Sequence, residues 1–224
     1  MTEQEWLNCT DPKLMLEFLR GKTSDRKLRL FACACARRLW HLLAREEWRP
    51  PPDDRSRKAV ELAETFVGGR ASEADLRVAS GPAQVARNEV GFSYPGCGEA
   101  FPVMMGASYA EASVADAVAE AVADALGDSE ILLRNTGPEA AALRCLFNPF
   151  RPVTVNHAWL TWNGGTVRSL AQTIYEECAF DRLPILADAL EEAGGDNDDI
   201  LAHLRSEGPH QCGCWPVDLI LGKS

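Results

Sequence analysis

The sequence has no long apolar run and no export signal, and both absences limit where the protein can act. Nowhere do about 18 apolar residues follow one another, which a membrane-spanning helix needs, so none of the 224 residues is expected to lie in a bilayer. The first residues, Met-Thr-Glu-Gln-Glu-Trp, are acidic and lack the basic start of a signal peptide. We therefore expect a soluble, cytoplasmic protein.

The familiar catalytic motifs are missing as well. There is no Gly-x-Ser-x-Gly elbow, no Gly-x-x-x-x-Gly-Lys-Ser/Thr phosphate loop, no Gly-x-Gly-x-x-Gly and no His-Glu-x-x-His. The chain has four histidines, which leaves few candidates for a general base. An unfamiliar enzyme with a pocket in the 91–106 segment stays open, but the pattern favours a protein without catalytic activity.

Positive charge is scarce and unevenly placed. The net charge of −10 argues against nucleic-acid binding, which needs a basic surface to neutralise phosphates. Residues 20–49 hold nine Lys or Arg against three Asp or Glu, whereas residues 108–208 hold six Arg against seventeen Asp or Glu. Two interpretations follow: the acidic half recognises another protein, or it lies against the basic part of the same molecule.

Helical periodicity dominates the chain. The clearest case is 24–47, where one face of a helix is apolar: Leu28, Phe31, Ala32, Cys35, Leu39, Leu42 and Leu43. Asp11-Pro12 predicts another helix start, and Gly21 a stop. Further helices are expected over 59–67, from 72, and over 108–126, 138–147, 166–177, 183–193 and 196–204, with a helix or strand at 215–221. The prediction is an all-α fold, an irregular multi-helix bundle with a long Gly/Pro-rich loop at 91–106.

The domain organisation has two interpretations. The simpler is a single helical domain over 1–224. The alternative has lobes 1–148 and 166–224 joined by 149–165, a segment with prolines, a Gly-Gly pair and two tryptophans. Trp159 and Trp162 either anchor a partner or pack beneath their own loop.

Eight cysteines are many for a chain without an export signal, so buried thiols or a metal site are better explanations than disulfides. His210, Cys212 and Cys214 lie within five residues, beside glycines that allow a chelating turn. Zinc takes four such ligands, and Cys97 or His203 could supply the fourth. Three interpretations stay open here: a zinc site, a redox-active thiol pair, and local packing without a cofactor.

Two other clusters have simpler explanations. Cys33 and Cys35 are two apart on a helix and point about 200° apart, so they cannot share a metal or a disulfide. Packing explains them, although an exposed Cys33 between Arg29 and Arg37 would be reactive. The acidic residues of 188–199 lack the spacing of a calcium loop and fit a solvated helical face.

Three segments resemble a large family of uncharacterised planctomycete proteins. They are Leu-Arg-Gly-Lys-Thr-Ser-Asp-Arg-Lys-Leu-Arg-Leu-Phe-Ala-Cys at 19–33, Asn-Pro-Phe-Arg-Pro-Val at 148–153, and Leu-Ala-Asp-Ala-Leu-Glu-Glu-Ala-Gly at 186–194. The resemblance covers most of the chain and implies no known activity. Our first hypothesis is a non-catalytic protein-interaction module with an acidic recognition surface. The alternative is a small zinc-binding or thiol-redox protein that uses His210, Cys212 and Cys214.

Overall fold

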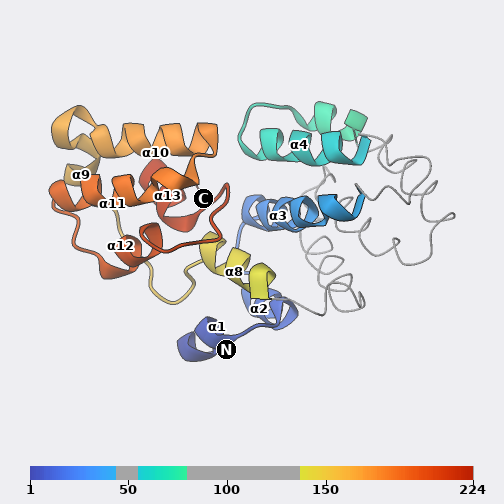
Figure 1. Cartoon of the computed structure of the whole chain (residues 1–224), viewed down its shortest axis with the longest axis horizontal. Helices are drawn as coiled ribbons and strands as arrows, with labels where there is room; N and C mark the ends of the chain where they lie inside the picture. The colour runs from blue at the N-terminus through green and yellow to red at the C-terminus, as the bar shows by residue number, and fades with distance from the viewer. Residues whose placement is uncertain (44–54, 80–136, 224) are drawn as a thin grey trace, which may run out of the picture. The chain divides into compact units, whose positions relative to one another are not determined.

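The computed structural model describes residues 1–43, 55–79 and 137–223 (Figure 1). All regular structure within these residues is helical, without a strand, which confirms the predicted all-α fold. Of the helices described, none combines the length and apolarity needed to cross a membrane. The predicted loop at 91–106 and the predicted helix at 108–126 lie outside the described residues.

The chain divides into two compact units, residues 1–140 and 141–224. The boundary therefore falls inside helix α8 (Gly137–Leu146) and not in the 149–165 segment that the sequence suggested as a junction. That segment is part of the second unit. It is anchored there by Trp159, whose large apolar side chain is 8% exposed and belongs to the core of this unit.

The first unit begins with two short helices, α1 (Glu3–Asn8) and α2 (Pro12–Leu19). Asp11 caps α2 as predicted, accepting a hydrogen bond from the Lys13 backbone N–H. Helix α1 was not predicted. A capping box starts it, in which the Thr2 hydroxyl accepts from the Glu5 N–H and the Glu5 carboxylate accepts from the Thr2 N–H.

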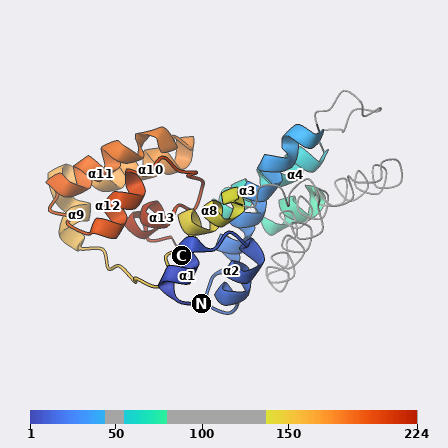
Figure 2. The ribbon, with the colours of Figure 1, turned by 60° about the horizontal axis from the view of Figure 1, so that its bottom comes forward.

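Helices α3 (Asp25–Leu43) and α4 (Arg55–Val67) run side by side in the first unit (Figures 1 and 2). The predicted apolar face of α3 is buried at Leu28, Phe31, Ala32 and Cys35; the side chains of 39–43 lie outside the described residues. Cys33 is 1% exposed, so it packs in the interior. Residues 73–79 form a further helical segment.

The second unit is a bundle built around α10 (Thr166–Glu177). It also contains α9 (His157–Thr161), the 3₁₀ turns η2 (Trp162–Gly164) and η3 (Phe180–Arg182), α11 (Leu183–Glu192), α12 (Asp198–Leu204) and α13 (Trp215–Leu221). Helix α10 packs against α9, α11 and α13, and α11 packs against α12 (Figures 1 and 2). The common core of these helices includes Val167, Ile174, Leu183, Leu186 and Leu190.

The connection between α11 and α12 sets the position of α12. Gly194 adopts a left-handed conformation with φ 85°, which ends α11. A Cβ on Gly195 would lie 2.6 Å from the Leu190 side chain, so the chain can pass here only without one. The Asn197 side chain then accepts from the Ile200 N–H and starts α12.

Candidate metal centre

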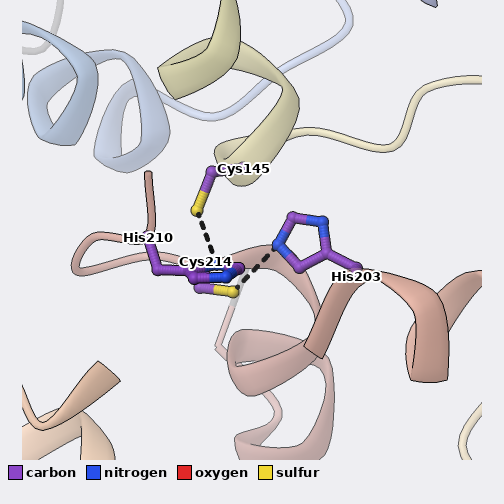
Figure 3. Close-up of side chains that lie close together, drawn as sticks. All are labelled: Cys145, His203, His210 and Cys214. Atoms are coloured by element: carbon purple, nitrogen blue, oxygen red, sulfur yellow. Dashed lines mark hydrogen bonds between the residues drawn. The ribbon is translucent and has the colours of Figure 1, made fainter. Parts of the chain in front are cut away.

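Four side chains of the second unit gather at one point: Cys145, His203, His210 and Cys214 (Figure 3). One sulfur or nitrogen atom of each lies within 4.8 Å of the corresponding atom of every other. Both cysteines are buried and both histidines are partly buried. Within the described part of the chain, this is the one group of three or more His, Cys, Asp or Glu residues placed to hold a metal ion.

The four residues come from separate elements. Cys145 lies in the last turn of α8 and His203 in the last turn of α12. His210 lies in the loop that follows α12, and Cys214 directly precedes α13. A group of this kind joins the ends of three helices and one loop.

A tight turn places Cys214 in the group. The Cys214 N–H donates to the Gln211 carbonyl at 2.9 Å, and Gly213 has φ 88°, as the third position of a type II turn requires. The Gln211 side chain also donates to the Ala142 carbonyl at 3.2 Å, which fixes the loop against the second-unit part of α8. Cys214 is consequently 1% exposed, whereas Cys212 lies at the surface of the turn.

His210 is held with one ring nitrogen toward the group. Its Nε2 lies 3.0 Å from the Ser206 carbonyl oxygen, an acceptor, so Nε2 carries the proton and donates it there. The other nitrogen, Nδ1, lies 3.9 Å from the Cys145 sulfur and has its lone pair toward the group. Metal-binding histidines commonly donate their other ring N–H to a backbone carbonyl, which fixes the tautomer in this way.

His203 is oriented by a different neighbour. The indole N–H of Trp215 donates to its Nδ1 at 3.2 Å, and its Nε2 lies 3.3 Å from the Cys214 sulfur. In this arrangement Nε2 of His203 carries the proton and donates a hydrogen bond, which the Cys214 sulfur accepts. A metal bound at Nε2 requires the proton to be on Nδ1 instead, which would replace the hydrogen bond from Trp215.

The surroundings lower the pKa of Cys145 and raise the pKa of His210. The hydrogen bond with Cys214 is the main cause that holds the pKa of the Cys145 thiol well below its ordinary value, and bonds to His203 and His210 add to it against the opposing effect of burial. Burial lowers the pKa of His210, but its bonds with Cys145 and the Ser206 carbonyl outweigh burial and raise that pKa overall. Thiolate is the form of cysteine that binds metals.

Two of the distances between donor atoms are close to those of a tetrahedral zinc site. Zinc binds sulfur at about 2.3 Å and imidazole nitrogen at about 2.0–2.1 Å, which puts the ligand atoms roughly 3.3–3.8 Å apart. The 3.3 Å between Cys214 Sγ and His203 Nε2 and the 3.9 Å between Cys145 Sγ and His210 Nδ1 lie close to that range. Two sulfurs and two nitrogens are a donor set that suits zinc.

The structure brings together some of the residues that the sequence singled out. His210 and Cys214 meet, and His203, weighed as a fourth ligand, joins them. Cys212 is not in the group, because its sulfur lies 3.2 Å from that of Cys178. Cys97 lies outside the described residues. Cys145 was missed, since it sits alone in an apolar helix, 65 residues before His210, with no local pattern to mark it.

Comparisons of the chain with protein-family models, with curated proteins and with solved structures give no match. The resemblance to the planctomycete proteins therefore stays a prediction, and the case for a function depends on the site itself.

Proposed function

We propose that the second unit binds one zinc ion through Cys145, His203, His210 and Cys214, and that the ion stabilises the fold of this unit. The observation that carries the proposal is the convergence of four donor atoms within 4.8 Å of one another. Their chemistry supports zinc over magnesium or calcium, which prefer oxygen ligands.

A structural role fits this site better than a catalytic one. Catalytic zinc sites keep one position open for water or substrate, while structural sites use four protein ligands. Four side chains are available here, one for each position around a tetrahedral ion, and the two thiols are buried. The ligands also come from α8, α12, the loop after it and the start of α13, so one ion would connect four segments of the unit.

Metal analysis of the untagged full-length protein tests the proposal. We expect about one zinc per chain after purification with zinc present, as a four-ligand site requires. Replacing zinc by cobalt should give the visible absorption of a tetrahedral site together with a sulfur-to-cobalt charge-transfer band. Absence of both metals after incubation with either would contradict the proposal.

Matched cysteine variants identify the ligands. Cys145→Ser and Cys214→Ser should lose the metal, because each removes one of the two sulfur donors. Cys212→Ser should keep it, although Cys212 is only two residues from Cys214, because its sulfur lies beside Cys178. Loss of zinc from Cys212→Ser equal to that from Cys214→Ser would show that the four ligands are assigned wrongly.

A further inference from the structure

A second pair of cysteines lies beside the candidate metal centre and outside it. The sulfur atoms of Cys178 and Cys212 are 3.2 Å apart, although the residues are 34 positions apart in the sequence. Both are thiols, Cys178 is exposed and Cys212 is partly exposed. We propose that Cys178 and Cys212 form a reversible disulfide with each other, by exchange with a low-molecular-weight disulfide such as oxidised glutathione. This bond is a redox-controlled crosslink of the second unit.

The backbone at Cys178 supports a specific role for this side chain. Cys178 ends α10 in the left-handed conformation, with φ 53° and ψ 33°. Glycine is the residue that usually occupies such a position, because a Cβ is unfavourable there. Among the described non-glycine residues only Asn163 shares a positive φ, and asparagine tolerates it well. A cysteine is held at a helix end that would favour glycine, with its sulfur against a second thiol.

The turn that carries Cys212 supplies the other half of the site. Cys212 is the second residue of the Gln211–Cys214 turn, which the Cys214 N–H closes. This turn directs residue 214 to the interior and leaves residue 212 beside the end of α10. A disulfide has a sulfur–sulfur bond of about 2.05 Å, so closing the bond requires the two sulfurs to approach by roughly 1 Å. Side-chain rotation at two surface positions can supply that movement.

The reaction is a two-step thiol–disulfide exchange. The exposed Cys178 loses its proton to solvent, and its thiolate attacks one sulfur of oxidised glutathione. The glutathione disulfide bond breaks, one glutathione leaves as thiolate, and Cys178 carries the other as a mixed disulfide. Cys212 then loses its proton and attacks the Cys178 sulfur, which releases the second glutathione. Two protein thiols are oxidised, and one glutathione disulfide is reduced to two glutathione thiols. An excess of reduced glutathione reverses both steps.

The crosslink would enclose α11 and α12 between its two ends. Because it would restrain the unfolded chain over this stretch, the oxidised second unit should resist unfolding more than the reduced one. It would also fix the loop between His210 and Cys214. The bond itself does not depend on the proposed zinc ion, since neither Cys178 nor Cys212 belongs to the group of four.

Peptide mapping of the full-length protein tests the crosslink. The reduced protein is incubated with oxidised glutathione, the remaining thiols are alkylated, and the digest is analysed without reduction. We expect a linked peptide pair joining Cys178 to Cys212, reversed by excess glutathione, and a higher midpoint of thermal unfolding for the oxidised form. The proposal would be overturned if these cysteines carried glutathione adducts without a link between them, or if Cys212 were bonded to Cys214.

Two variants and a metal measurement make the result specific. Cys178→Ser should abolish the linked pair and the rise in midpoint, whereas Cys9→Ser, a partly exposed cysteine of the first unit, should leave both unchanged. Zinc content is measured on the same samples before and after oxidation. A crosslink in protein that binds no zinc would disprove the metal site alone, and zinc binding without a crosslink would disprove the thiol pair alone.

Discussion

At the residue scale, the contact between Trp215 and His203 gives the candidate metal centre an internal reporter. The indole N–H donates to Nδ1 of His203 at 3.2 Å, and the two rings have centroids 5.5 Å apart. Zinc at Nε2 would place the imidazole proton on Nδ1, where it faces another donor. Binding of zinc should thus change the surroundings of this indole.

We predict that adding zinc to chelator-treated protein changes its tryptophan fluorescence and that Trp215→Phe removes most of the change. The measurement is a fluorescence titration of both proteins, with cobalt absorption to confirm that the variant still binds metal. Trp159→Phe serves as the control, because this tryptophan lies in the core of the same unit, whereas the Trp215 indole donates directly to the candidate ligand His203. An unchanged zinc response in Trp215→Phe would argue against Nε2 of His203 as a ligand.

Cys35 gives a second residue-scale prediction. Burial raises the pKa of its thiol to about 12, and its side chain is 2% exposed. At pH 8 a thiol with that pKa is thiolate in about one molecule in ten thousand. Iodoacetamide should consequently label the exposed Cys178 of the native protein long before Cys35, and should label both in denaturant. Mass-spectrometric mapping of the alkylated peptides measures this; equal labelling in the native state would contradict the burial of Cys35.

At the scale of the element, α11 depends on one buried face. Leu186 is fully buried in the core of the second unit, while the adjacent Ile185 is 55% exposed. Leu186→Ala should lower the free energy of unfolding by about 2–5 kcal/mol, because it removes buried methyl groups and leaves a cavity. Ile185→Ala, in the same helix, should change it by less than about 0.5 kcal/mol, as surface substitutions usually do.

Urea denaturation followed by circular dichroism compares the two variants. Both substitutions introduce alanine into α11, and leucine and isoleucine differ in helix propensity by only a few tenths of a kcal/mol, so the difference between the variants reports mainly burial. Similar losses from Leu186→Ala and Ile185→Ala would mean that α11 does not pack through the face described.

At the scale of the whole molecule, the four candidate ligands all belong to the unit formed by residues 141–224. Removal of zinc should therefore affect this unit selectively. We predict that a chelator increases amide hydrogen exchange in α12 and α13 by tenfold or more, about 1.4 kcal/mol of lost local stability, with little change in α2 or α3. Hydrogen-exchange mass spectrometry of the full chain measures both regions at once. Equal increases in the two units would exclude a local structural role for the ion.

The excess of acidic residues over 108–208 also concerns the whole molecule. Part of the negative charge is balanced inside the second unit, where Arg205 pairs with Asp188 and Glu191 and Arg151 pairs with Asp199. These pairs are exposed and contribute little to stability. The hypothesis of a protein-interaction module with an acidic recognition surface stays a prediction, which recovery of a specific partner from a native lysate would support.

The sequence by itself determined most of the helices described, although it did not predict α1 or α9. Each of these signals belongs to a single helix or to its ends, so it can be recognised without the fold: Asp11-Pro12 before α2, Gly194 after α11 and the apolar periodicity of α3. It also marked His210 and Cys214, which are close in sequence.

Only the tertiary structure decided which cysteines meet. Cys145 approaches His210 across 65 residues, and Cys178 approaches Cys212 across 34. Such contacts depend on how α8 and α10 pack and on which side of a four-residue turn each sulfur lies. Cys212 and Cys214 look equivalent in the sequence, yet the Gln211–Cys214 turn separates them into a candidate metal ligand and a candidate redox thiol. A one-dimensional pattern cannot express that separation, because it arises from the direction of side chains in the folded chain.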